Sequence, residues 1–160
     1  MVSVQKIPGG LNPVRRRQWL LAGALGCLLC ASDAWAALAG DLASVQSDAQ
    51  AFGALTSQTV MAAATVYTQT LPNGLVVRQY ADSAGLVFAV AWEGPVLPDF
   101  GRLLGSYYPV YTLAVRQQKR GVNFQTPELV IESGGMMRSF SGRALLPTRL
   151  PAAMVPLDIR

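Results

Sequence analysis

The chain has 160 residues, among them 13 Lys and Arg, 9 Asp and Glu and no His, so its net charge is +4. This length suits one domain. Without His, the protein cannot use a His-based catalytic triad, an imidazole general base or most zinc and copper sites.

The first 36 residues have the three parts of a secretory signal peptide. Arg15, Arg16 and Arg17 precede an uncharged apolar run from Trp19 to Ala31, and Ala34-Trp35-Ala36 follows. The run is shorter than the roughly 20 residues that cross a membrane. We therefore predict cleavage after Ala36, a periplasmic location and no membrane span after processing. The arginines fit both the general secretory and the twin-arginine route.

Removal of residues 1–36 changes the charge and the cysteine content. Nine of the basic and eight of the acidic residues follow residue 36, so the mature chain has a net charge of +1. This balance does not indicate a nucleic-acid partner. Cys27 and Cys30 are spaced like a redox or metal motif, but they lie in the apolar run and leave with it. We therefore expect no metal, no cofactor and no disulfide in the mature protein.

Residues 37–64 are predicted to form an N-terminal helix over 44–52, ended by Gly53, and a linker. The predicted sheet core covers residues 65–146 and begins with strands at 65–70, 75–80 and 86–92. In the third strand, Phe88, Val90 and Trp92 alternate with small residues that include Ala89 and Ala91. This pattern predicts a central strand with its large side chains on one face and a helix lying over the alanines.

A helical insertion is predicted at about residues 99–120. Pro98-Asp99 begins a short helix that Gly105 ends, and a second helix over 110–120 finishes with Lys119 and Arg120 in its last turn. Both helices can pack on the sheet.

The remaining residues predict a hairpin and a tail. Residues 128–132 alternate charged and apolar side chains, and Gly134-Gly135 predicts a reversal into a strand over 136–144. Three prolines in residues 147–160 predict an extended tail that lies across the domain. The fold class is therefore α+β, an antiparallel sheet of about five strands with two or three short helices packed on it.

Because the mature chain has no His and no Cys, carboxylates are the catalytic groups that remain possible. Glu93 and Asp99 flank the Gly94-Pro95 exit from the central strand, and two suitably spaced carboxylates hydrolyse glycosidic bonds. The alternative interpretation is that Glu93 is a solvated strand end and Asp99 a helix cap. A hydrolase acting on an envelope polymer is therefore one hypothesis, and we consider a non-enzyme more consistent with the sequence.

Aromatic residues near arginines favour a second hypothesis, a non-catalytic binding or assembly module of the cell envelope. Such residues are enriched at the centres of interfaces, although the aromatic ones also suit a core. The candidates are Trp92, Arg102, Tyr107, Tyr111, Arg138 and Arg143. Their partner would be an envelope protein or ligand that the sequence does not identify.

A third hypothesis is a small-molecule or lipid carrier, with helices covering the large-residue face of the sheet.

Several runs of the mature chain resemble a known family. They are SVQSDAQ, LPNGLVVRQYADSAGLVFAVAWEGPVLPDFGRLLGSYYP, PELVIESGGMMRSFSGRALLP and the closing LDIR. They are similar to the uncharacterised exported proteins grouped as domain-of-unknown-function family 2844. The resemblance covers nearly all of residues 37–160. It implies an exported protein of Gram-negative bacteria and no assigned activity.

Overall fold

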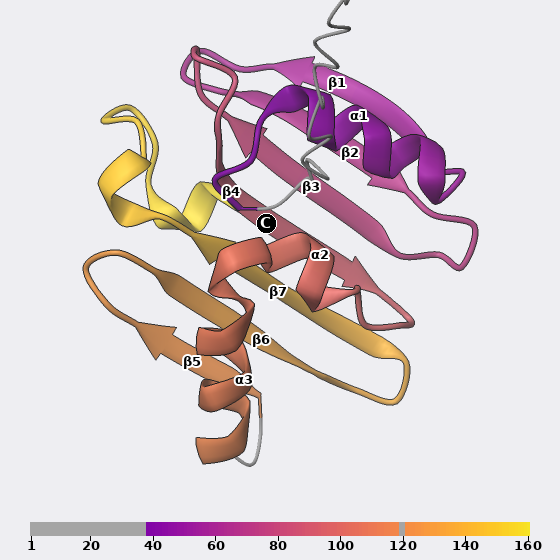
Figure 1. The fold of residues 1–160 in the computed structure, drawn as a ribbon, viewed down its shortest axis with the longest axis vertical. Helices are drawn as coiled ribbons and strands as arrows, with labels where there is room; N and C mark the ends of the chain where they lie inside the picture. The colour runs from indigo at the N-terminus through magenta and orange to yellow at the C-terminus, as the bar shows by residue number, and fades with distance from the viewer. Residues whose placement is uncertain (1–37, 119–120) are drawn as a thin grey trace, which may run out of the picture. The chain divides into compact units, whose positions relative to one another are not determined.

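The computed structural model describes residues 38–118 and 121–160 (Figure 1). The predicted signal peptide over 1–36 lies outside the described residues, as do Lys119 and Arg120, which we placed at the end of the second insertion helix. None of the described helices combines the length and hydropathy that a membrane crossing requires.

An antiparallel sheet of seven strands organises the described residues, in the order β1-β2-β3-β4-β7-β6-β5. The strands are β1 (Leu55–Val60), β2 (Thr65–Thr70), β3 (Val76–Ala81), β4 (Val87–Gly94), β5 (Val122–Gln125), β6 (Val130–Met136) and β7 (Ser139–Leu145). The chain runs from β1 to β4 as a meander and then passes through the helices to the far edge. It returns through β5 and β6, so that β7 pairs with β4 at the centre.

The α+β class and the antiparallel sheet are as predicted, but the count of about five strands is wrong. The sequence did not predict β1, which lies in the expected linker, or β5. Every residue of β1 is exposed, so no alternation of buried and exposed positions marks it as a strand. Only four residues make up β5, too few for a clear pattern.

The three α-helices of residues 38–118 lie on one face of the sheet, which we call the helix face (Figure 1). They are α1 (Leu42–Ala51), α2 (Phe100–Leu104) and α3 (Tyr108–Gln117), with the 3₁₀ turn η1 (Gly105–Tyr107) between α2 and α3. The first turns of α1 and α2 are capped alike. The Asp41 carboxylate accepts from the backbone N–H of Ser44 at 3.0 Å, and the Asp99 carboxylate accepts from that of Arg102 at 3.1 Å.

The opposite face is covered by the C-terminal tail, so we call residues 147–160 the strap and this side the strap face. Met154 and Ile159 of the strap are buried against Ala89 and Ala91. The prediction that a helix lies over the alanines is therefore wrong. Two 3₁₀ turns, η2 (Pro147–Arg149) and η3 (Pro156–Asp158), interrupt the otherwise extended strap.

A bulge in β4 overturns the predicted alternation of its side chains. The pairing of β3 with β4 shifts register between Tyr80 and Ala81. Phe88 consequently packs with the alanines in the strap-face cluster, while Val90 and Trp92 belong to the helix-face core. Both faces of the central strand are buried, one in the helix-face core and the other under the strap.

The reversal between β6 and β7 also differs from the prediction. It falls at Met137-Arg138, because Met136 pairs with Ser139, while Gly134 and Gly135 continue β6. Cross-strand contacts explain this register. It places Glu132 opposite Arg143, where the two side chains form a 2.7 Å ion pair. In the separate pairing of β7 with β4, Gly142 lies opposite Trp92, where a Cβ atom would overlap the indole ring.

Candidate functional site

A pocket of about 240 Å³ opens on the helix face, between the end of α1 and the start of α2 over β2 and β3. Its apolar lining comes from Phe52, Leu71, Leu75, Val77, Leu97, Pro98 and Leu103. Its polar lining comes from Gln69, Asn73, Gln79, Asp99 and Arg102. A mostly apolar wall with a few convergent polar groups is the usual composition of a small-molecule site. We call it the amide pocket, after the two glutamines.

The two glutamines of the amide pocket differ in their hydrogen bonding. Gln69 on β2 and Gln79 on β3 both face the helices and are only 3% and 1% exposed. Gln69 Nε2 donates to the backbone oxygen of Val45 at 2.8 Å and so ties α1 to the sheet. Gln79 Oε1 is buried and accepts no hydrogen bond from the described residues. Buried polar atoms are nearly always paired, so this oxygen is an exception among the described residues.

The rim of the amide pocket contains the only two predicted site residues that line it, Asp99 and Arg102. Asp99 caps α2, and its second carboxylate oxygen lies 3.7 Å from the Arg102 guanidinium. That guanidinium lies over the Phe52 ring, 4.9 Å from its centroid. A cation–π contact of this kind joins α2 to the end of α1 beside the pocket.

Glu93 lies on the strap face, away from Asp99. It is half-exposed and pairs with Arg78 on the neighbouring strand at 2.6 Å. It lines a second hollow, together with Glu132 and Arg143, whereas Asp99 lines the amide pocket. The structure therefore does not bring the two carboxylates of the hydrolase hypothesis into one site.

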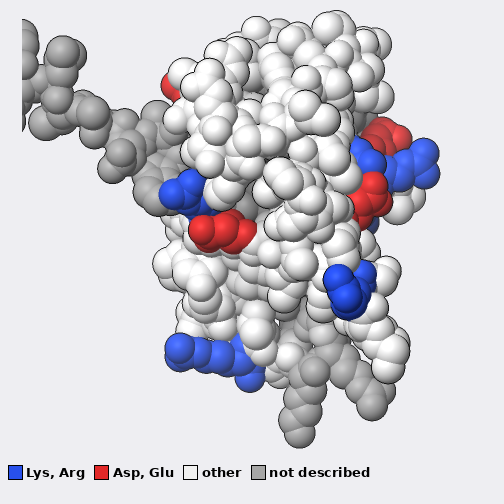
Figure 2. All heavy atoms as spheres, turned by 90° about the vertical axis from the view of Figure 1, so that its right-hand side faces the viewer, with Lys and Arg blue, Asp and Glu red and all other residues white. Residues whose placement is uncertain are grey.

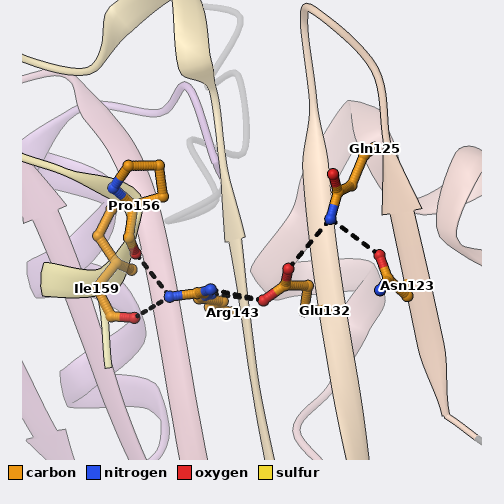
Figure 3. A network of polar contacts seen from close by, with 6 residues as sticks. All are labelled: Asn123, Gln125, Glu132, Arg143, Pro156 and Ile159. Carbon is orange, nitrogen blue, oxygen red and sulfur yellow. Dashed lines mark hydrogen bonds and ion pairs between the residues drawn. The ribbon is translucent and has the colours of Figure 1, made fainter.

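Arg143 holds the strap on the sheet (Figure 3). Its guanidinium bonds Glu132 at 2.8 Å through Nε and donates through one terminal nitrogen to the backbone oxygens of Pro156 at 2.6 Å and Ile159 at 3.3 Å. Gln125 Nε2 extends the network by donating to Glu132 at 3.3 Å. Arg143 thus binds this chain's own tail. Arg138 lies at the exposed tip of the β6–β7 hairpin.

The aromatic candidates form part of the helix-face core. Trp92 meets Phe100 edge-on at 5.2 Å, and Phe100 lies 4.3 Å from Tyr111. Burial raises the pKa of the Tyr111 phenol, which a side-chain hydrogen bond with Ser133 partly offsets. Tyr107 is half-buried against the same core. These rings position α2 and α3 on the sheet, next to the amide pocket.

One side of the molecule carries few charged groups. Figure 2 shows one side of the molecule, where most atoms are uncharged and the larger groups of acidic atoms adjoin basic ones. Among the residues that the structure describes, no three acidic side chains gather closely enough to hold a metal ion.

Gln69 and Gln79 were absent from the predicted site residues. The signal that could have found them is a polar residue on the inward face of a strand, since Gln79 follows Val77 and Leu75 in the alternation. Nothing in the sequence distinguishes the paired amide from the unpaired one, because the partner of Gln69 is on another element.

These features define an α+β protein with a small, mostly apolar pocket on the helix face of its sheet. A family model described as "Protein of unknown function (DUF2844)" matches residues 34–159, so the chain belongs to this family. The resemblance seen in the sequence is thereby confirmed. No curated protein and no solved structure matches the chain.

Proposed function

We propose that this protein is a non-catalytic binding module of the bacterial cell envelope and that it binds a small molecule in the amide pocket. The pocket itself is the observation that carries the proposal. Its volume of about 240 Å³ is slightly below the range of about 300–1,000 Å³ that ligand sites usually have, and its composition is typical of them.

The size of the pocket favours a small molecule over a lipid. A cavity of about 150 Å³ takes up benzene, so 240 Å³ accommodates a molecule only somewhat larger. The hydrolase alternative has weaker support, because Glu93 and Asp99 line different hollows on different faces of the sheet.

Placement in the envelope rests on the signal-peptide pattern of residues 1–36. The mature protein, purified from the periplasmic fraction of its native host, should begin at Ala37 when its amino terminus is sequenced. Recovery of a protein that still carries Met1 would contradict export with cleavage.

Binding in the amide pocket is tested with a pair of matched exposed leucines. Leu97 lines the pocket and is 50% exposed, whereas Leu113 on α3 is 56% exposed and does not line it. We expect calorimetry to show binding of the bicyclic molecules indole and benzofuran to the wild-type protein. Leu97→Trp should abolish this binding by covering the entrance, and Leu113→Trp should leave it unchanged. Failure of both molecules to bind at millimolar concentration, or equal effects of the two variants, would refute the proposal.

A further inference from the structure

The strand β1 forms one edge of the sheet (Figure 1). In the part of the chain that the structure describes, β1 pairs with β2 alone, and all six of its residues are exposed. We propose that β1 pairs antiparallel with β1 of a second copy of this chain, so that the two sheets join around a two-fold axis. This inference is independent of the amide pocket and goes beyond the proposed function.

The opposite edge strand, β5, is blocked by a side chain. Gln118 Nε2 donates to the backbone oxygen of Asn123 at 2.8 Å, and Gln118 Oε1 accepts from the backbone N–H of the same residue at 2.6 Å. The amide thus occupies the backbone groups of Asn123 as a further strand would. In contrast, β1 has no charged residue and no Pro, which commonly keep edge strands from pairing.

The hydrogen bonding of the β1–β2 hairpin shows which backbone groups of β1 point outward. At the turn, the N–H of Met61 donates to the backbone oxygen of Ala64 at 2.8 Å. Inward and outward groups alternate along an antiparallel strand. The N–H and C=O groups of Thr56, Gln58 and Val60 therefore point away from β2, where a second strand can bond to them.

A second copy fits this edge in a defined register. When Gln58 lies opposite Gln58 of the second copy, Thr56 lies opposite Val60, and every outward group of the two strands has a partner. The same register places Leu55 opposite Met61, and these side chains are 79% and 45% exposed in one copy. Pairing therefore joins the backbone groups and covers apolar side chains at the same time.

The absence of charge favours a second copy as the partner. Residues 49–77 contain no charged side chain, so two copies of this region approach without repulsion. A different chain recognised by its charge would find no opposite charge here. Because Gln118 blocks β5, β1 is the open edge of the described sheet, and association ends at two copies.

Sedimentation equilibrium of the protein purified from its native host tests the pairing. A contact between two short strands belongs to the weak class of interfaces, so we expect a dimer at about 100 μM. Gln58→Lys places two like charges opposite each other and should weaken dimerisation at least about tenfold, as should Gln58→Glu. An equimolar mixture of these two variants should form dimers again, because the opposed charges then attract. Asn123→Lys, the matched control at an exposed position of the blocked edge, should remain dimeric.

Several outcomes would overturn the inference. They are a monomeric wild-type protein at this concentration, a Gln58→Lys variant that stays dimeric, and equal weakening by Gln58→Lys and Asn123→Lys. Failure of the mixed Gln58 variants to dimerise would show that the two residues do not face each other. A monomer that binds an uncharged extended peptide along β1 would identify the partner as a different chain. Each variant changes an exposed side chain, and circular dichroism checks that the fold is retained.

Discussion

Gln69 and Gln79 both line the amide pocket, but the Gln69 amide is hydrogen-bonded to Val45 and the Gln79 amide oxygen is unpaired. Replacing each by Met should therefore change the free energy of unfolding in opposite directions. Gln79→Met removes an unpaired buried amide oxygen and should raise the free energy of unfolding by about 1 kcal/mol. Gln69→Met breaks the hydrogen bond to Val45 and should lower the free energy of unfolding by about 1–2 kcal/mol. Urea denaturation measures both. A loss of stability in Gln79→Met would mean that its oxygen already has a partner.

Gly142 and Gly134 form a second matched pair, on adjacent strands. A Cβ atom on Gly142 would overlap the Trp92 ring and the backbone oxygen of Glu132, so Gly142→Ala should destabilise the protein by about 2–3 kcal/mol. A Cβ atom on Gly134 meets nothing within 4 Å. Gly134→Ala should therefore change the unfolding free energy by less than about 0.5 kcal/mol. Similar values for both variants in urea denaturation would contradict the packing of Trp92 on Gly142.

Tyr111 predicts a pH dependence of stability at high pH. Burial raises the pKa of its phenol from the ordinary value of 10.0, so the folded protein retains this proton when the unfolded chain has lost it. The stabilisation is complete below about pH 10 and decreases as the pH rises through the folded-state pKa. Thermal unfolding of Tyr111→Phe should therefore show a shallower fall in Tm above about pH 10 than that of the wild-type protein. An identical fall in both would contradict the assignment.

At the scale of elements, the β6–β7 turn has a sequence that does not suit its conformation. Met137 and Arg138 have φ angles of 51° and 68°, which are costly for residues with a Cβ and are ordinary for Asn-Gly in a two-residue hairpin turn. Replacing Met137-Arg138 by Asn-Gly should raise the free energy of unfolding by about 1–2 kcal/mol. The midpoint of urea denaturation tests this. An unchanged or lower midpoint would show that the reversal lies elsewhere, for example at Gly134-Gly135.

At the scale of the whole molecule, the strap completes the core of the strap face, and Arg143 connects it to the sheet. Arg143→Met removes the ion pair with Glu132 and the bonds to Pro156 and Ile159. We expect amide hydrogen exchange in residues 154–160 to become faster, because the strap opens more often.

Arg78→Met is the matched control for the strap. Arg78 lies on the same face of the sheet and pairs with Glu93, and within the part of the chain that the structure describes no hydrogen bond joins it to the strap. Its replacement should leave hydrogen exchange in residues 154–160 unchanged. If both variants accelerate exchange equally, the strap depends on the general charge of the face and not on Arg143.

The site residues show how far the sequence defines a binding site. Asp99 was identified because it stands at a predicted helix start, and Arg102 because it lies near aromatic residues in the sequence. Both line the amide pocket. Gln79 was missed, since its importance comes from the absence of a donor on elements that are distant in the sequence. A missing partner has no signature in a sequence.

The sequence by itself determined the family, the α+β class and the five strands whose turns and alternating side chains are local signals. Only the tertiary structure decided the exposed strand β1, the face on which Phe88 lies, the reversal at Met137-Arg138 and the strap on the alanine face. The physical reason is the distance along the sequence over which each kind of interaction acts. Turn residues and helix caps act within a few positions, whereas a bulge, a strand register and the fit of Trp92 over Gly142 depend on contacts between distant parts of the chain.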